Sequence, residues 1–162
     1  MKKTFLIAIG LIIFDQLIKN IMVFLLEMGQ SILVIKNFFS LTLLGNKGAA
    51  FSILSSNTLL LILISIAVLN VIYFCLIKNK KLKNIEEISY GILIGGITGN
   101  LIDRVIRGEV IDYLDFNIFG YNFPVFNFAD ICIIVSIILI FIDTIKGDKN
   151  EVSSNTKWNK IR

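Results

Sequence analysis

Four long apolar runs, separated by short polar segments, dominate the pattern of the chain. They extend from about Phe5 to Leu26, Thr58 to Ile77, Ile88 to Ile106 and Phe126 to Ile145. Each has about 19–22 residues, and a helix of about 20 residues crosses a hydrocarbon layer of roughly 30 Å. The pattern therefore predicts four transmembrane helices. The first is predicted to be an uncleaved anchor, because it lacks a small-residue cleavage site.

The segment between the first two runs predicts a different kind of element. Residues Ser31 to Leu44 are rich in β-branched and aromatic side chains, which is typical of short strands. We expect one or two strands here, within a small β-cradle over about residues 28–56. The fold class is thus predicted as an all-α membrane protein with four transmembrane helices and an extracytoplasmic β-cradle. One domain covers residues 1–146, and residues 147–162 form a polar, disordered cytoplasmic tail.

Composition and charge agree with a membrane protein. The chain is 56% hydrophobic and only 17% charged, whereas soluble domains have about 45–50% apolar and about 25% charged residues. The net charge of +4 does not indicate a nucleic-acid partner, because the basic residues lie in short clusters beside the apolar runs.

The basic clusters also predict the orientation. Eleven of the 16 lysines and arginines lie on one side of a four-helix arrangement: Lys2, Lys3, Lys78, Lys80, Lys81, Lys83, Lys146, Lys149, Lys157, Lys160 and Arg162. By the positive-inside rule, both termini are predicted to be cytoplasmic. The segments 27–57 and 107–125 are then predicted to face outward.

The residue types exclude several chemistries. The chain has no histidine, which removes histidine-based triads, zinc sites and proton relays. Its two cysteines, Cys75 and Cys132, lie inside apolar runs and have no metal-binding spacing. We therefore expect no metal and no cofactor. Hydrolytic chemistry would have to come from carboxylates, or from a hydroxyl paired with a lysine.

Two aspartates near the outer ends of neighbouring helices are the candidates for such chemistry. Asp112 follows the third run, and Asp130 lies near the start of the fourth. A short connection places these helices side by side in the predicted bundle, so the two carboxylates can meet. Paired carboxylates share a proton, so one can activate water while the other hydrogen-bonds a scissile carbonyl. The alternative that each acid is an interfacial residue with its own partner remains open on spacing alone.

Other polar residues are arranged at helical spacing. Asn100, Asp103 and Arg104 fall on one helical face, where Asp103 and Arg104 could neutralise each other. Asp15 and Lys19, at i and i+4 in the first run, are expected to form an internal ion pair.

Five sequence blocks, in order along the chain, resemble the signature blocks of lipoprotein signal peptidase (signal peptidase II). They are "FDQLIK", "NKGAAF", "GNLIDR", "VIDYLD" and "FNFAD", between residues 14 and 130. The resemblance implies an aspartyl endopeptidase of the bacterial cytoplasmic (inner) membrane. Its active site lies on the outer face. It removes the signal peptide from diacylglyceryl-modified prolipoproteins, just before the lipidated cysteine. The implied partners are this lipidated signal peptide and membrane lipid, with the enzyme acting as a monomer.

The resemblance also implies roles for individual residues. Asp112 and Asp130 match the catalytic pair, and Asp115 does not match either position. Asp103 is implied to have a structural role. The supporting or substrate-binding positions are Asp15, Lys19, Asn46, Asn100, Arg104 and Asn127. One departure is visible: many members have a basic residue where this chain has Gly45, and here a lysine follows at Lys47.

Three other functions are compatible with some of these residues. A small transporter or proton channel would use Asp15, Lys19, Asp103 and Arg104 as a relay, but most polar residues cluster in the outer half. A Ser-Lys peptidase would use a serine among residues 52–56 as nucleophile, but no lysine is obviously placed beside one. The other intramembrane aspartyl class requires a GxGD block, which is absent. We further predict that residues 113–126 form an aromatic loop that closes over the site as a lid.

Overall fold

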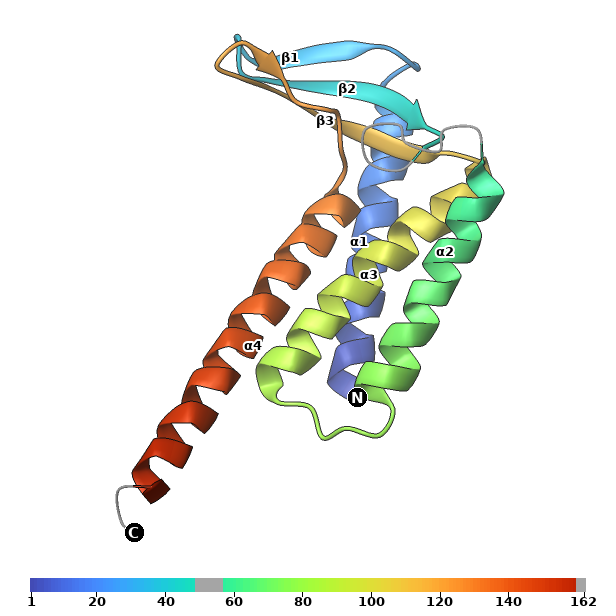
Figure 1. Ribbon diagram of the computed structural model, residues 1–162. Coiled ribbons are helices and arrows are strands. Elements are labelled where there is room, and N and C mark those ends of the chain that lie inside the picture. The colour runs from blue at the N-terminus through green and yellow to red at the C-terminus, as the bar shows by residue number, and fades with distance from the viewer. Residues whose placement is uncertain (49–56, 160–162) are drawn as a thin grey trace.

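The computed structural model describes the backbone of residues 1–48 and 57–159, and the side chains of residues 1–48 and 57–146. It contains a helical bundle with a small sheet across one end (Figure 1). The described helices are α1 (Lys2–Leu25), α2 (Thr58–Val71) with its π-helical continuation η2 (Ile72–Ile77), α3 (Asn84–Arg107) and α4 (Phe128–Asn159). The described strands are β1 (Ser31–Ile35), β2 (Phe39–Asn46), β3 (Val110–Ile118) and β4 (Tyr121–Asn122).

The sheet is antiparallel, with the strand order β1-β2-β3-β4. The strands predicted between Ser31 and Leu44 are confirmed as β1 and β2. The predicted loop over residues 113–126 is corrected, because most of it belongs to β3 and β4. Leu44 of β2 pairs with Asp112 of β3, and Asn46 pairs with Val110. This pairing places Asp112 on a strand in mid-sheet and not in a loop.

Helix α3 is the centre of the bundle, with α1, α2 and α4 around it (Figure 1). It approaches α1 through glycines: a methyl group at Gly91, Gly95 or Gly99 would lie 2.8, 3.0 or 2.6 Å from atoms of α1. On another face, a methyl group at Gly96 would lie 2.6 Å from the carbonyl oxygen of Ala129 in α4. Small residues allow close helix packing in membranes, where the hydrophobic effect does not drive helices together.

The outer surface of the bundle is apolar. Leu6, Phe24, Leu59 and Phe141 are all more than 60% exposed, as expected of side chains that face lipid. Among the residues that the structure describes, three helices are long and apolar enough to span a membrane: Lys2–Leu25, Thr58–Ile77 and Phe128–Lys146. The predicted membrane protein with a small sheet is thus confirmed.

The tail prediction is also corrected. α4 continues as a helix to Asn159, beyond the predicted end of the fourth run at Ile145. Extending an existing helix adds one hydrogen bond per residue and avoids the cost of nucleation. The segment after Lys146 contains no proline, so nothing in its sequence forces the helix to end.

Candidate active site

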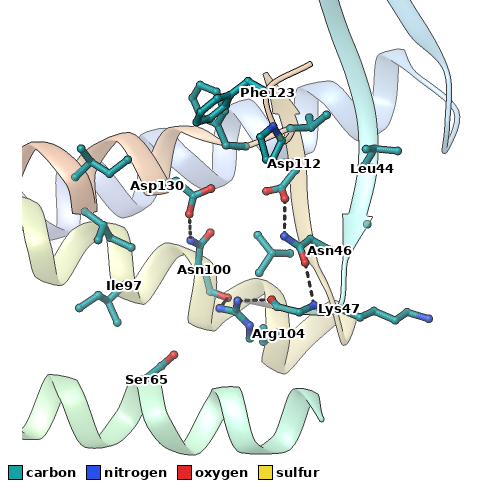
Figure 2. A pocket seen from close by; sticks show the side chains of 18 residues that line it. Leu44, Asn46, Lys47, Ser65, Ile97, Asn100, Arg104, Asp112, Phe123 and Asp130 are labelled. Atoms are coloured by element: carbon teal, nitrogen blue, oxygen red, sulfur yellow. Dashed lines mark hydrogen bonds between the residues drawn. The ribbon is translucent and has the colours of Figure 1, made fainter. Parts of the chain in front are cut away.

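A pocket of about 980 Å³ lies where the sheet meets the helices (Figure 2). Asp112 and Asp130 both line it, on opposite sides, with their carboxylates facing the same space. The other polar side chains that line it are Asn46, Lys47, Ser65, Asn100 and Arg104. Its apolar wall comes from β2 and β3, from the segment between β4 and α4, and from α3 and α4. The apolar side chains are Leu44, Val110, Phe123, Pro124, Val125, Phe126, Ile97, Ile133 and Ile134.

Asp112 projects from β3 and is only 2% exposed. Its Oδ2 accepts a hydrogen bond from Asn46 Nδ2 at 2.9 Å, and its Oδ1 accepts one from Asn127 Nδ2 at 2.6 Å. Asn46 reaches it as a diagonal neighbour on β2, because Asn46 pairs with Val110 on the same face of β3. Burial, followed by the negative charge of Asp130, raises the pKa of Asp112 to about 6.

Asp130 lies in the first turn of α4 and forms a reciprocal cap with the residue before the helix. Asn127 Oδ1 accepts a hydrogen bond from the Asp130 backbone N–H at 3.1 Å, and Asp130 Oδ2 accepts one from the Asn127 backbone N–H at 3.1 Å. This arrangement is a capping box, in which two otherwise unpaired N–H groups are satisfied. The other oxygen of Asp130, Oδ1, accepts a hydrogen bond from Asn100 Nδ2 at 2.8 Å.

Two further side chains complete the N-terminus of α4. Asp15 Oδ1 accepts from the Ala129 backbone N–H at 3.1 Å, and the Tyr113 hydroxyl accepts from that of Phe128 at 3.3 Å. Burial raises the pKa of the Tyr113 phenol above its usual range. The start of α4 is therefore held by α1 and β3 as well as by its own cap. Tyr113 was not predicted as a site residue, although its place in the block "VIDYLD" beside Asp112 is a usable signal.

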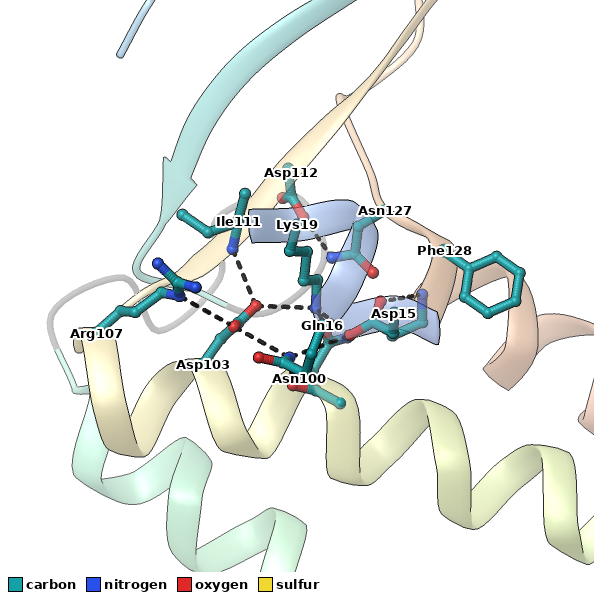
Figure 3. A network of polar contacts seen from close by, with 12 residues as sticks. Asp15, Gln16, Lys19, Asn100, Asp103, Arg107, Ile111, Asp112, Asn127 and Phe128 are labelled. Carbon is teal, nitrogen blue, oxygen red and sulfur yellow. Dashed lines mark hydrogen bonds and ion pairs between the residues drawn. The ribbon is translucent and has the colours of Figure 1, made fainter. Parts of the chain in front are cut away.

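A buried charge cluster lies behind the pocket (Figure 3). Lys19 Nζ is 2.9 Å from Asp15 Oδ2 and 2.8 Å from Asp103 Oδ2. Asp103 also accepts from the Arg107 Nε at 3.3 Å and from the Ile111 backbone N–H at 3.3 Å. The predicted Asp15–Lys19 ion pair is present. Through Ile111 the cluster reaches the residue next to Asp112, which ties α1 and α3 to β3.

Arg104 is placed differently from the sequence prediction. It does not pair with Asp103, which faces Lys19 and Arg107. Arg104 Nη2 donates to the Gly48 carbonyl at 3.1 Å, and Nη1 reaches the Asn100 carbonyl at 3.5 Å. Adjacent positions on a helix point about 100° apart, so the two side chains enter different environments. Arg104 instead lines the pocket, where its charge interacts with Asp130 and Asp112.

Asp115 lies on the other face of β3. Side chains three positions apart on a strand point to opposite sides of the sheet, so Asp112 and Asp115 cannot serve the same space. Asp115 Oδ2 accepts a hydrogen bond from Thr42 Oγ1 at 2.7 Å and is not among the residues that line the pocket.

The departure at Gly45 has a structural correlate. A Cβ at Gly45 would lie 2.4 Å from the carboxyl carbon of Glu109, so a basic side chain there would require Glu109 to move. Lys47 is among the residues that line the pocket, but its side chain extends away from the carboxylate pair (Figure 2).

Of the eight predicted site residues, five line the pocket: Asn46, Asn100, Arg104, Asp112 and Asp130. The other three do not line the pocket. Lys19 contacts Asn100, and Asn127 contacts Asp112 and Asp130. Asp15 contacts Lys19 and Ala129. The serines of the Ser-Lys alternative, Ser52, Ser55 and Ser56, lie outside the described residues, as does the end of the block "NKGAAF".

Comparison with known proteins agrees with this arrangement. Two solved structures, each described as a bacterial membrane enzyme structure determined by the in meso method, match with TM-scores of 0.84 and 0.80. Both are 38% identical in sequence; they cover 93% and 90% of this chain, and 92% and 94% of their own. The fold is thus that of a bacterial membrane enzyme.

The family follows from sequence comparison. The model of the signal peptidase (SPase) II family matches residues 7–146. Two relatives named lipoprotein signal peptidase, from Staphylococcus aureus strains MRSA252 and Newman, are 38% identical over 152 residues. The match covers 94% of this chain and 93% of each relative. The chain belongs to the signal peptidase II family, which is a family of aspartic peptidases.

Proposed function

We propose that this enzyme removes the signal peptide from diacylglyceryl-modified prolipoproteins, cutting just before the lipidated cysteine. The observation that carries the proposal is the pair Asp112 and Asp130, which face one pocket from β3 and α4. Residues 1–146 form the peptidase domain. The apolar pocket wall suits a signal helix, and its place at the sheet end of the bundle suits a scissile bond near the membrane surface.

Asp112 and Asp130 have different roles in the proposed reaction. Asp112 is the more buried of the two and has a raised pKa, so it is assigned the shared proton and donates a hydrogen bond to the scissile carbonyl. Asp130 accepts hydrogen bonds on both oxygens, from Asn100 and Asn127, and is assigned the role of the base. Asp130 then takes a proton from the attacking water, whose oxygen bonds to the scissile carbonyl carbon. The same proton passes from Asp130 to the leaving nitrogen as the C–N bond breaks. Because the pair titrates as a unit, this assignment describes the dominant microstate.

The remaining polar residues support the pair. Asn46 and Asn127 orient Asp112, Asn100 orients Asp130, and Arg104 contributes positive charge to the pocket. Asp15 and Lys19 hold α1 against the start of α4 and against α3.

The proposed topology has four spans, with α3 as the fourth crossing helix. α3 has 24 residues, the same number as α1, and packs among the three more apolar helices. A helix shielded by its neighbours can carry charged residues in its first and last turns without exposing them to lipid. Lys2, Lys3 and the α2–α3 connection lie at the end of the bundle opposite the sheet (Figure 1). We therefore place both termini in the cytoplasm, the sheet outside, and a monomeric enzyme in the bacterial inner membrane with lipid around it.

The proposed activity is tested by cleavage of a diacylglyceryl-modified prolipoprotein by the purified protein. The expected product ends just before the modified cysteine, and the unmodified precursor should be cut poorly. EDTA should leave the rate unchanged, because two carboxylates suffice for the chemistry. Strong inhibition that zinc reverses would refute the aspartyl mechanism, and failure to cut the modified precursor would refute the proposed function.

The rate of cleavage is expected to depend on pH as a bell. At low pH both carboxylates are protonated and no base remains, whereas at high pH both are ionised and no acid remains. The high-pH limb of kcat/KM reports the free enzyme and should lie near the Asp112 pKa of about 6. A bound substrate helix excludes more water, so the corresponding limb of kcat should lie at higher pH. Initial rates measured across this range check both limbs. A single rising limb with the midpoint of a lysine would favour a Ser-Lys mechanism instead.

Arg104→Gln provides a variant of this experiment. Removing a positive charge that interacts with the carboxylates should raise the pKa of Asp112 further and move the high-pH limb of the bell to higher pH. Arg107→Gln is the matched control, because Arg107 contacts Asp103 and Asn20 and does not line the pocket. An unshifted bell in Arg104→Gln would leave the pair in place but remove Arg104 from its electrostatics.

The topology is tested by thiol labelling in intact cells. In a background with Cys75 and Cys132 replaced by serine, Ser31→Cys should react with an impermeant reagent and Asn84→Cys should not. Both positions are exposed, and they lie at opposite ends of the bundle. The reverse labelling pattern would place the carboxylate pair on the cytoplasmic side.

The described polar residues do not favour a transporter. The cluster around Lys19 and Asp103 lies near the sheet end of α1 and α3 and does not line a path along the bundle (Figure 3). Ion flux through vesicles containing the purified protein would be the observation that revives that interpretation.

A further inference from the structure

Three asparagine side chains direct their amide groups at the carboxylate pair. Asn46 Nδ2 and Asn127 Nδ2 donate to the two oxygens of Asp112, at 2.9 and 2.6 Å. Asn100 Nδ2 donates to Asp130 Oδ1 at 2.8 Å. An amide can also sit in the flipped orientation, in which its oxygen would face the carboxylate and repel it. The catalytic geometry therefore depends on what fixes the orientation of each amide.

Each amide oxygen accepts a hydrogen bond from a group that can only donate. Asn46 Oδ1 accepts from the Gly48 backbone N–H at 2.9 Å, and Asn127 Oδ1 accepts from that of Asp130 at 3.1 Å. Asn100 Oδ1 accepts from Lys19 Nζ at 2.9 Å. A backbone N–H and an ammonium group cannot accept hydrogen bonds. In the flipped orientation, the NH2 group of the amide would therefore face another donor. Each orientation is thus determined by its partner.

Lys19 differs from the other two orienting groups because it is a side chain. Lys19 comes from α1, and no residue of α1 is among those that line the pocket. Its side chain is fully buried together with those of Asp15 and Asp103. Those two carboxylates hold its ammonium group 2.9 and 2.8 Å away, which fixes the nitrogen in front of Asn100 (Figure 3). The ion cluster therefore does more than join two helices.

We propose that Lys19 is a positioning residue for the peptidase reaction, which acts by fixing the Asn100 amide so that its N–H group faces Asp130. The inference rests on the proposed function, in which ionised Asp130 activates the water. If Asn100 flipped, its oxygen would face Asp130 Oδ1, and the contact would be favourable only with Asp130 protonated. A protonated Asp130 cannot take a proton from water, so an unfixed Asn100 lowers the fraction of enzyme that can react.

The test compares two variants that both disrupt the Lys19–Asp103 pair. Asp103→Asn leaves the Lys19–Asn100 hydrogen bond in place. Lys19→Met/Asp103→Asn removes that hydrogen bond and keeps the charge of the cluster balanced, because one positive and one negative group are lost together. Losing a hydrogen bond that supports a charged group corresponds to about a ten- to hundredfold effect. We expect kcat/KM of the double variant to fall by this factor relative to Asp103→Asn.

A double-mutant cycle separates positioning from a general role in structure or charge. The same two variants are compared in the Asn100→Ala background, with single-turnover rates measured at high enzyme concentration. If Lys19 acts through Asn100, the ratio of the single-turnover rates of the two variants should fall to about twofold or less in the Asn100→Ala background, because the amide to be oriented is gone. An equal factor in both backgrounds would overturn the proposal, since a structural or long-range charge effect does not require Asn100. Equal activity of the two variants with Asn100 intact would also overturn the proposal.

A second variant keeps the test decisive if Lys19→Met/Asp103→Asn fails to fold. Lys19→Gln/Asp103→Asn retains a side chain that can donate to Asp15 and then presents its amide oxygen toward Asn100. That oxygen attracts the Asn100 amide N–H away from Asp130, so the same loss and the same coupling are expected. If neither variant folds, Lys19 is a folding residue and the proposal is wrong. Retained activity of Asp112→Asn would instead refute the proposed function, whatever the cycle shows.

Discussion

Replacing Asp112 or Asp130 by asparagine is expected to abolish prolipoprotein cleavage, with kcat/KM reduced about 10³-fold or more. Each change removes either the acid or the base of the pair, and general acid–base catalysis contributes about 10²–10⁴-fold. Cleavage of the modified precursor by purified variants measures the effect. Asp115→Asn is the matched control: it changes the same residue type on the same strand, but on the opposite face of the sheet.

Asp112→Asn and Asp130→Asn should both remain folded, so that a loss of cleavage reports lost chemistry and not lost structure. A carboxyl group whose pKa is raised in the folded state destabilises the fold as pH rises toward that pKa, because the folded protein must release a proton that it binds more tightly. Asp112→Asn removes this cost above about pH 6, although asparagine can accept from only one of the two amides around it. Asp130→Asn keeps one oxygen for the α4 cap and should cost about 1 kcal/mol. Near-normal cleavage by Asp112→Asn together with loss in Asp115→Asn would show that the wrong face of β3 was chosen.

Lys19→Met alone is expected to destabilise the protein by about 3–5 kcal/mol. The substitution leaves Asp15 and Asp103 buried without their shared cation, and breaking a buried ion pair by removing one partner costs about this much. Asp103 retains Arg107, and Asp15 retains the Ala129 N–H, so part of each carboxylate's stabilisation remains.

Thermal unfolding in detergent measures this loss, and Lys80→Met is the matched control because Lys80 is exposed in the α2–α3 connection. The control should unfold at the wild-type temperature. If Lys19→Met unfolds at the same temperature as Lys80→Met, Asp15 and Asp103 must share a proton in place of the lysine. The stability of the cluster would then not depend on its cation. The expected instability is also why the test of Lys19 as a positioning residue uses the charge-balanced variant.

The local features of the chain were readable because they depend on neighbours in sequence. The apolar runs predicted the positions of α1, α2 and α4, since length and hydrophobicity alone decide whether a segment suits a membrane. The β-branched stretch predicted β1 and β2. The spacing of Asp15 and Lys19 predicted their ion pair, because residues four apart meet on a helix.

Features that depend on distant pairing were missed or assigned incorrectly. Residues 113–126 resemble a loop in sequence, and only pairing with β2 makes their first part a strand. The partner of Asp103 could not be chosen from its helix alone. Arg104 is adjacent to it in sequence, but Lys19, 84 positions earlier, is the cation that α1 brings within 2.8 Å.

The residue types and blocks of the sequence were sufficient to select Asp112 and Asp130 as candidates and to predict their family. The tertiary structure decided how these two side chains are held. It placed Asp112 on a strand between two amides, and it assembled the start of α4 from Asp15, Tyr113 and Asn127. It also brought Lys19 to Asn100. The physical reason is that a hydrogen bond requires atoms within about 3 Å in the correct orientation. For residues far apart in the chain, only the packing of the helices and the register of the sheet determine which atoms meet in that way.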